Sequence, residues 1–297
     1  MSRLVSALLA GALLSAAGCA RDGPAPGGVV ATLLPVEMMA RELVGQDASV
    51  HTLVPPGASP HTFEPRPADM ARLAGAGLVV RVGGGLDDWV LGLLASAPEA
   101  SAELALLEVP GLELLPGGGG DATPDPHVWL DPLRVRDALA PALADALADL
   151  APPHAAAVRG RLADFQARRS ALDAEIRRTL APVPQRSYVP FHDAWRYFAA
   201  RYDLEKVAVV QAFPGEEPTP RELARLVDAA RAAGVGAVLV EPQLDPRTAA
   251  VIAREFSGAT VVVDPNGDPA DPERASYEAL MRFNARAFRR ALGGGGP

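Results

Sequence analysis

Short apolar runs alternate with segments of helical spacing in the first part of the chain. Apolar and β-branched residues fill the runs, which lie at 29–34, 49–54, 78–82 and 105–109. Apolar residues recur every three or four positions at 36–44, 68–76 and 86–94. Runs of the first kind are typical of buried strands, and segments of the second kind are typical of amphipathic helices. Their alternation favours a parallel sheet covered by helices on both faces.

The same alternation returns in the last third of the chain. Strands are expected at 187–191, 207–210, 236–240 and 260–263, and helices at 194–201, 220–233, 246–256 and 272–292. A further helix is expected from Pro132 to residue 150, because Asp131 is a good N-cap and Pro is favoured at the first helical position.

Between these two halves lies one long amphipathic segment. Its apolar residues, three and four positions apart for the most part, are Val158, Leu162, Phe165, Leu172, Ile176 and Leu180. A helix of about 30 residues is far longer than an average one and suits a rigid link between domains. We therefore expect an α/β protein of two lobes, each with a parallel sheet flanked by helices, joined by one long α-helix. The expected divisions are an N-terminal lobe at 29–150, a linking helix at 151–182 and a C-terminal lobe at 183–297.

The N-terminus has the pattern of an export signal. A charged start is followed by a short apolar stretch, which predicts a signal peptide at 1–18. Small residues directly before Cys19 resemble a bacterial lipobox, in which Cys19 would carry a lipid anchor. The plainer alternative is that Cys19 only belongs to the tail of an ordinary signal peptide. Residues 19–28, rich in Gly and Pro, would be a tether. We expect an exported protein in the periplasm or on the outer face of the cytoplasmic membrane.

Composition excludes some functions. With 36 acidic and 28 basic residues, the formal charge is −8, and Lys206 is the only lysine, so the chain has no basic stripe for nucleic acid. A single cysteine allows neither an internal disulfide nor a thiolate-based zinc site.

Three of the five histidines lie in short turns bounded by Pro or by apolar runs. These are His61, His127 and His192, and Asp264 follows the apolar run 260–263. Ligands of open parallel sheets collect beyond the carboxyl ends of the strands, which is where these four residues are expected. Three imidazoles and one carboxylate suit zinc and its first-row neighbours.

The remaining candidates have weaker assignments. His51 and His154 lie in an expected strand and at a helix start, and are read as structural. Asp131 and Asp193 are expected to begin helices, although either could accept a hydrogen bond from a ligand imidazole. Glu241 follows the strand at 236–240 and could be a further metal ligand, a partner of a ligand histidine, or the partner of an arginine.

Several short motifs carry a resemblance to a known family. They are GASPHTFEP at 57–65, DPHVWLDP at 125–132, HDAWRYF at 192–198, EPTPREL at 217–223, VEPQ at 240–243 and VDP at 263–265. In this order they resemble the metal receptors of ABC importers for zinc and manganese, the ZnuA/TroA-like group. The resemblance implies two α/β lobes bridged by a long helix. It also implies a metal between the lobes, held at His61, His127, His192 and Asp264.

The resemblance implies a binding protein that captures zinc and delivers it to the permease of an ABC importer, and not an enzyme. A histidine at position 192 favours zinc, because manganese prefers oxygen donors. A manganese or iron receptor of the same type is the first alternative. A zinc metallohydrolase, with Glu241 or Asp264 as general base, is a weaker alternative, and a surface adhesin is another. We expect a monomer whose partners are zinc, the permease and, through Cys19, the membrane.

Overall fold

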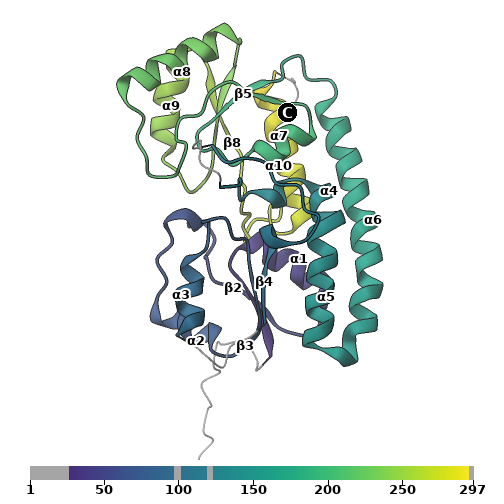
Figure 1. The fold of residues 1–297 in the computed structure, drawn as a ribbon. Coiled ribbons are helices and arrows are strands. Elements are labelled where there is room, and N and C mark those ends of the chain that lie inside the picture. The colour runs from purple at the N-terminus through teal and green to yellow at the C-terminus, as the bar shows by residue number, and fades with distance from the viewer. Residues whose placement is uncertain (1–26, 97–101, 119–122, 294–297) are drawn as a thin grey trace, which may run out of the picture.

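The N-terminal lobe is built on a parallel four-stranded sheet (Figure 1). We describe a computed structural model that covers residues 27–96, 102–118 and 123–293. The strand order is β2 (Val50–Thr52), β1 (Gly28–Ala31), β3 (Ala76–Arg81) and β4 (Ala102–Ala105). Its helices are α1 (Leu34–Val44), α2 (Pro67–Leu73) and α3 (Trp89–Ala95). Val30 pairs with His51 on one side and with Val79 on the other, so β1 is a central strand.

The C-terminal lobe repeats this plan. Its parallel sheet has the order β6 (Glu205–Lys206), β5 (Ser187–Pro190), β7 (Ala237–Val240) and β8 (Ala259–Val262). Its helices are α7 (Arg196–Arg201), α8 (Pro220–Ala232), α9 (Pro246–Glu255) and α10 (Tyr277–Ala291). The fully buried strand β7 reads Ala-Val-Leu-Val without alternation, as expected for a parallel strand covered on both faces. Two such lobes confirm the predicted fold class.

A long helix runs beside both lobes. Helix α6 (Ala155–Leu180) has 26 residues and follows the hairpin partner α5 (Ala140–Leu150). Before α5, the chain passes through α4 (Pro132–Arg134) and a π-helical segment at Val135–Leu139. Figure 1 shows α6 running from the bottom of the N-terminal lobe up beside the C-terminal lobe. None of the described helices has the length and apolarity needed to cross a membrane.

One hydrophobic core crosses the boundary between the lobes. It contains β1 residues such as Val29, α6 residues such as Phe165, and Tyr188 and Phe288 of the C-terminal lobe. Fully buried Arg169 on α6 reinforces this connection, since its guanidinium pairs with Glu42 of α1 and with Glu278 of α10. The same guanidinium lies over the rings of Phe165 and Tyr277. Both lobes are therefore fastened to the same helix.

Several elements differ from the sequence-based expectation, and the single helix expected at 132–150 is divided into α4, the π-helical segment and α5. Strand β4 ends at Ala105, and the apolar residues after it form a 3-10 turn (Leu106–Glu108) that buries Leu106 and Leu107. The strand predicted at 105–109 therefore lies earlier in the chain, at Ala102–Ala105. The prediction failed because a buried turn has the same run of apolar residues as a buried strand. Strand β6 likewise comes before the expected 207–210, where isolated backbone hydrogen bonds to β5 continue irregularly.

The last helix starts five residues later than expected, at Tyr277. The side chains of Asp268 and Asp271 accept hydrogen bonds from backbone N–H groups two residues ahead, which holds 268–274 in turns. Ser276 then caps α10 by accepting from the Ala279 N–H. The predicted lobe boundaries at 151 and 183 stay predictions. The predicted signal peptide and Cys19 lie outside the described residues, as does most of the tether, of which Gly28 already belongs to β1.

Candidate metal site

The three predicted histidines come from three separate turns. His61 lies in a 3-10 turn (Pro60–Thr62) that follows β2, and His127 directly precedes a similar turn (Val128–Leu130). His192 follows β5 and forms a parallel bridge with Gln211. Pro60 precedes His61 and Pro126 precedes His127, and the ring of each proline fixes its own backbone dihedral φ. The sequence thus places each imidazole on a short, restrained connection.

These turns bring the three imidazoles together. Their ring centroids are 4.8 to 5.3 Å apart, and Nε2 of His61 lies 3.3 Å from Nε2 of His127. Among the residues that the structure describes, they form the one group of His, Cys, Asp or Glu side chains close enough to share a metal ion, with ligand atoms within 4.8 Å of one another. A cavity of about 10 Å³ lies against all three histidines, roughly the space that one water-sized sphere occupies.

Buried carboxylates orient two of the three rings. Asp125 Oδ1 lies 2.7 Å from Nδ1 of His127 and also accepts the His127 backbone N–H. Glu241 Oε2 lies 3.3 Å from Nδ1 of His192, while its Oε1 accepts the indole N–H of Trp195. When Nδ1–H donates to a carboxylate, the lone pair of Nε2 is free to bind a metal. His127 and His192 therefore both present Nε2 to the small cavity.

The third histidine stays neutral for a different reason. Burial, together with the smaller effects of the nearby imidazoles of His127 and His192, lowers the pKa of His61 to about 2. A neutral imidazole is the form that coordinates a metal. The site is therefore ready to accept a cation without first releasing a proton from His61 near neutral pH.

The fourth predicted ligand does not join this group. Asp264 is fully buried, and its Oδ2 accepts a hydrogen bond of 2.8 Å from Arg274. Its Oδ1 accepts the backbone N–H groups of Asn266 and Gly267 at 2.9 and 3.0 Å. Gly267 has φ of +84°, and a Cβ there would lie 2.9 Å from the Arg274 carbonyl oxygen, so this turn requires glycine. Coordination by Asp264 remains a prediction, and it requires the carboxylate to leave Arg274.

The two aspartates considered as partners of ligand histidines have other contacts. Asp131 caps α4 by accepting from the Leu133 N–H and pairs with Arg134. Asp193 pairs with Arg196 and with Lys206, the only lysine. Burial alone would raise the pKa of Asp193, but the hydrogen bonds and charges of Lys206 and Arg196 outweigh it and lower the pKa.

Sequence reasoning did not assign a role to Asp125. Its motif was recognised, but the carboxylate two residues before His127 was not singled out as the partner of that ring. The C-terminal lobe holds this segment in place, because the Tyr197 hydroxyl donates to the Asp125 carbonyl oxygen at 3.0 Å. The Trp129 indole N–H similarly donates to the Pro265 carbonyl oxygen at 2.8 Å.

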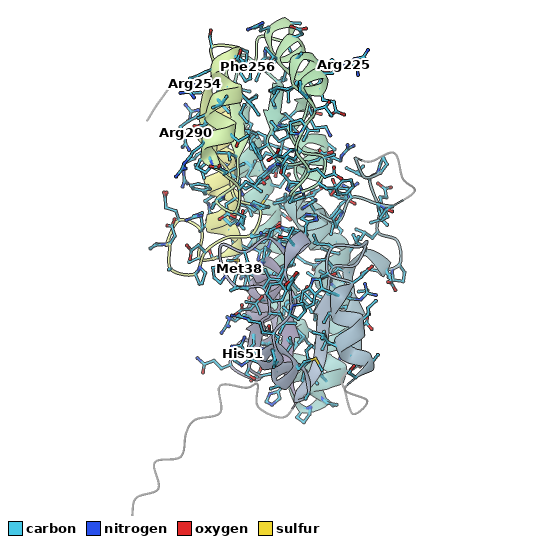
Figure 2. All side chains as sticks on the ribbon, turned by 90° about the vertical axis from the view of Figure 1, so that its left-hand side faces the viewer. Met38, His51, Arg225, Arg254, Phe256 and Arg290 are labelled. Carbon is cyan, nitrogen blue, oxygen red and sulfur yellow. The ribbon has the colours of Figure 1, made fainter. Side chains whose placement is uncertain are left out.

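The other two histidines lie away from the site. His51 is part of β2, low on the N-terminal lobe in Figure 2. His154 precedes α6 and faces Asp47 at 3.3 Å. These positions agree with the expectation that His51 and His154 are not metal ligands.

The donor set fits a divalent first-row cation. Three imidazole nitrogens meet in a small space, and the buried carboxylates of Asp125 and Glu241 lie beside Nδ1 of His127 and His192. Oδ2 of Asp125 is buried and has no hydrogen-bond partner, which leaves negative charge uncompensated. A dication between the histidines would compensate that charge. Imidazole-rich sets suit zinc, whereas manganese prefers oxygen.

Comparison with known proteins agrees with this geometry. The model of the family described as "ZnuA: Zinc-uptake complex component A periplasmic" matches residues 29–291. The chain is 28% identical to a high-affinity zinc uptake system protein ZnuA of Paracoccus denitrificans, over 99% of both chains. It is 26% identical to a zinc-binding lipoprotein AdcA of Streptococcus pneumoniae, where it spans 56% of the relative's length.

Solved structures show the same architecture. A crystal structure of ZnuA aligns with a TM-score of 0.80 at 28% identity, covering 89% of this chain and 98% of that one. A laminin-binding protein (Lmb) of Streptococcus agalactiae, described as an adhesin with metal-transporting activity, aligns with a TM-score of 0.78 at 24% identity, and this likeness supports the fold alone. The family consists of solute-binding receptors and not of enzymes. With its three-histidine site at the boundary of two parallel-sheet lobes, this chain belongs to the ZnuA family of periplasmic zinc-uptake components.

Proposed function

We propose that this protein captures zinc outside the cytoplasmic membrane and delivers it to the permease of an ABC importer. The observation that carries the proposal is the convergence of His61, His127 and His192 from both lobes onto one small cavity. The names of the relatives, a zinc uptake protein and a zinc-binding lipoprotein, support the same cargo.

The ligand chemistry supports zinc over manganese. No carboxylate oxygen belongs to the described group of ligand atoms, and manganese depends on such oxygens. Manganese-bound neighbours share the fold at 16% identity. We retain Asp264 as a predicted fourth ligand, which would add one oxygen to the three nitrogens.

The contacts of the acidic residues support a receptor over a hydrolase. Glu241 is engaged by His192 and Trp195, and Asp264 is engaged by Arg274. Neither carboxylate is free to act as a general base toward a metal-bound water. A receptor needs only to capture and release its metal, which requires no general base.

The N-terminal sequence and the family support a location outside the cytoplasm. We propose that the chain is exported and held at the membrane through a lipid on Cys19, as a monomer. Its relative in Streptococcus pneumoniae is described as a lipoprotein. Replacing Cys19 with Ala should release the exported protein from the membrane fraction, which immunoblotting of fractions would show.

Metal competition tests the central claim. The chain from residue 20 onward would be stripped of metal, offered equal zinc, manganese and iron, and analysed for bound metal. We expect one zinc per chain, and we expect zinc binding to be much weakened in His192→Ala. The matched control is His51→Ala, which removes a histidine outside the group and should bind as the unaltered chain does.

Two results would change the proposal. Preferential retention of manganese or iron would keep the receptor and change its cargo. Failure to bind any metal, in a chain whose circular dichroism shows it folded, would refute the metal-receptor function.

A further inference from the structure

Strand β8 is an edge strand of the sheet in the C-terminal lobe, with β7 as its neighbour on the inner side. The backbone N–H groups of Ala259 and Val263 donate to carbonyl oxygens on the β7 side at 2.9 and 3.0 Å. Because alternate residues of a strand bond to the same neighbour, the N–H and C=O groups of Thr260 and Val262 face outward. Such groups are a template for pairing with another chain.

The other edges of the two sheets have features that hinder pairing. At the edge formed by β2, the Arg41 guanidinium donates to the outward-facing carbonyl oxygen of Val50 at 2.9 Å. Strand β4 contains the charged Glu103, and β6 has only two residues. Charge and short length are common protections of an edge strand. Strand β8 has four residues, Ala-Thr-Val-Val, and contains neither a charge nor a proline.

The outer side of β8 also exposes side chains that favour strand pairing. Val262 is 46% exposed although it is a large apolar residue, and Thr260 is exposed as well. Both side chains are β-branched, and residues of this kind are enriched in strands. The edge of β8 is therefore open in its backbone and suited to pairing in its side chains.

An apolar groove lies at the carboxyl end of β8. Its volume is about 330 Å³, and its apolar lining residues are Val240, Pro242, Leu244, Pro246, Val262 and Phe283. The charged residues of its lining already have partners. Glu241 faces His192, and Asp271 pairs with Arg274. What the groove offers to a partner is therefore apolar surface.

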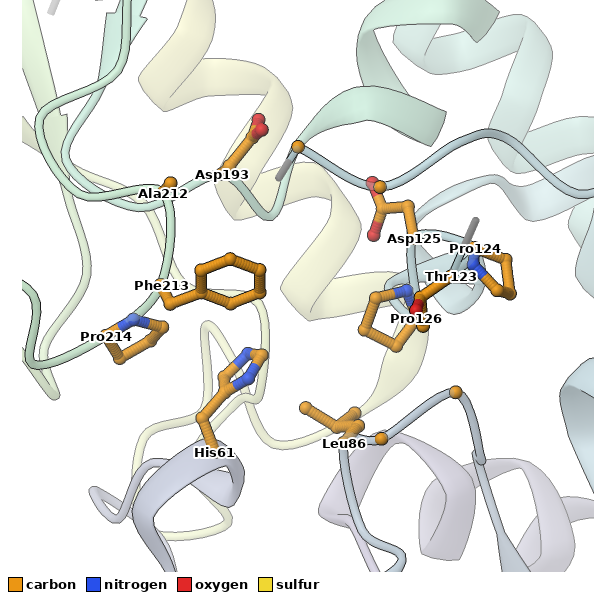
Figure 3. A pocket seen from close by; sticks show the side chains of 14 residues that line it. His61, Leu86, Thr123, Pro124, Asp125, Pro126, Asp193, Ala212, Phe213 and Pro214 are labelled. Atoms are coloured by element: carbon orange, nitrogen blue, oxygen red, sulfur yellow. The ribbon is translucent and has the colours of Figure 1, made fainter. Parts of the chain in front are cut away.

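The cavity beside the metal site differs from this groove. Its volume is about 360 Å³, and Figure 3 shows His61 on its wall. Asp193 on this wall pairs with Lys206 and Arg196, and Asp125 lies against a ligand histidine. None of its described lining residues belongs to a strand. Unlike the groove, it does not adjoin a free strand edge.

Two unpaired arginines lie at the amino end of β8. Arg254 is in the last turn of α9, shortly before β8, and Arg290 is in the last turn of α10. The end of α10 adjoins the same end of the sheet, since a Cβ at Gly236 would lie 3.7 Å from the Ala291 carbonyl oxygen. Figure 2 shows both arginines on one side of the lobe. Both are exposed, and neither forms an ion pair with another described residue.

The neighbouring charges leave this end of β8 positive. Glu255 follows Arg254, and Arg231 donates to the Glu255 carbonyl oxygen. These two side chains have opposite charges, so the charges of Arg254 and Arg290 remain. Carboxylates of a partner would find these two guanidinium groups free of other acids.

We propose that the outer edge of β8 binds an extended, acidic segment of a protein partner by strand addition. Thr260 and Val262 would bond to the backbone of the added strand, and the groove would take up one of its apolar side chains. Arg254 and Arg290 would pair with its carboxylates. In this mode main-chain hydrogen bonds provide affinity and side chains provide selectivity. The inference goes beyond the proposed function and does not depend on zinc.

Peptide binding to the chain from residue 20 onward tests the proposal. The probe is a fluorescent peptide of alternating valine and threonine with glutamates at its carboxyl end, where an antiparallel strand would meet the two arginines. The comparison peptide has lysines in place of the glutamates. Fluorescence anisotropy should show saturable binding of the acidic peptide and at least about tenfold weaker binding of the lysine peptide. Hydrogen exchange of the Thr260 and Val262 N–H groups should slow when the acidic peptide binds.

A substitution in β8 tests the backbone contacts. Thr260→Pro removes an outward-facing N–H without removing a bond to β7, and proline is tolerated at such edge positions. The matched control is Thr260→Val, which keeps the N–H. We expect Thr260→Pro to weaken binding of the acidic peptide by about tenfold or more and Thr260→Val to bind it as the wild type does.

A double substitution tests the charges without altering the strand. Arg254→Glu with Arg290→Glu should weaken binding of the acidic peptide by about tenfold or more. The matched control is Arg221→Glu with Arg225→Glu on α8; Figure 2 shows Arg225 on the opposite side of the lobe. This control should bind the acidic peptide as the wild type does.

Four results would overturn the proposal. One is that the folded wild type does not bind the acidic peptide. Another is equal binding by the wild type and a Thr260→Pro chain whose circular dichroism shows it folded. Unchanged binding by the Arg254→Glu, Arg290→Glu variant would exclude the arginines. Dimers in sedimentation that Thr260→Pro abolishes, without peptide binding, would make a second copy of the chain the occupant. Zinc content measured on the same samples keeps the two proposals separate, because either can fail alone.

Discussion

The two sides of the metal site use buried carboxylates in opposite ways. On one side, Asp125 lies 2.7 Å from Nδ1 of His127 and Glu241 lies 3.3 Å from Nδ1 of His192, so each carboxylate helps to orient a ligand ring. On the other side, Asp264 is bound by Arg274, which keeps a potential ligand away from it. All three carboxylates are buried. The difference shows that the partner of a carboxylate, and not its burial or its distance along the chain from a motif, decides what it does for a metal.

Removing a ligand from the histidine side should have the largest effect. His127→Ala deletes one of three nitrogens and leaves Asp125 buried without its ring. Because loss of an outer partner alone costs about 10–100-fold in affinity, loss of the ligand should exceed the upper end of that range. Zinc competition with a fluorescent chelator would measure it. His154→Ala is the control and should bind zinc as the wild type does. If His127→Ala kept a zinc affinity within about twofold of the wild type, His127 would not be a ligand.

Removing only the orienting carboxylate should have an intermediate effect. Asp125→Asn keeps the shape of the side chain but loses the charge that holds Nδ1–H of His127, so zinc affinity should fall by about 10–100-fold. Asp131→Asn, in the residue that directly follows the turn after His127, should leave affinity unchanged because Asp131 caps a helix. Titration calorimetry on both variants checks the difference. Equal affinities would mean that Asp125 has no part in positioning the ring.

The sequence predicted the histidines better than their partners. His61, His127 and His192 each lie in a short turn between regular elements, and the edge of a parallel sheet places such turns together. The role of Arg274 was missed because 272–292 reads as one helix, whereas the structure places Arg274 in a turn that reaches back to Asp264. Local spacing shows where an element can begin, but which side chain crosses a loop to a buried carboxylate depends on the packed structure.

Releasing the carboxylate on the opposite side should have a smaller effect with the opposite sign. Arg274→Ala leaves the buried carboxylate of Asp264 without its positively charged partner, which destabilises the metal-free protein by about 3–5 kcal/mol. Zinc can then become the partner of Asp264, so zinc affinity should rise by about tenfold.

Thermal unfolding with and without zinc would measure both consequences for Arg274→Ala. Arg282→Ala, which removes an arginine paired with Glu175 on the outside of α10, is the matched control. The double variant with Asp264→Ala should lose the gain in affinity. A gain that persists in the double variant would exclude Asp264 as the ligand responsible.

The third histidine offers the smallest and most local test, because His61 has no carboxylate behind it. Its pKa is about 2 in the folded chain, mainly through burial, with His127 and His192 adding to the shift, against about 6.5 in an unfolded chain. Between these values the unfolded state binds a proton that the folded state does not, so the free energy of unfolding falls as the pH falls. From pH 7.5 to 5.5, His61 should contribute a loss of about 1 kcal/mol in the free energy of unfolding of the metal-free protein.

Urea unfolding of wild type, His61→Gln and the control His154→Gln at both pH values would measure this loss. The loss should shrink in His61→Gln alone, and an unchanged loss there would show that His61 takes up its proton as readily in the folded chain as in the unfolded one.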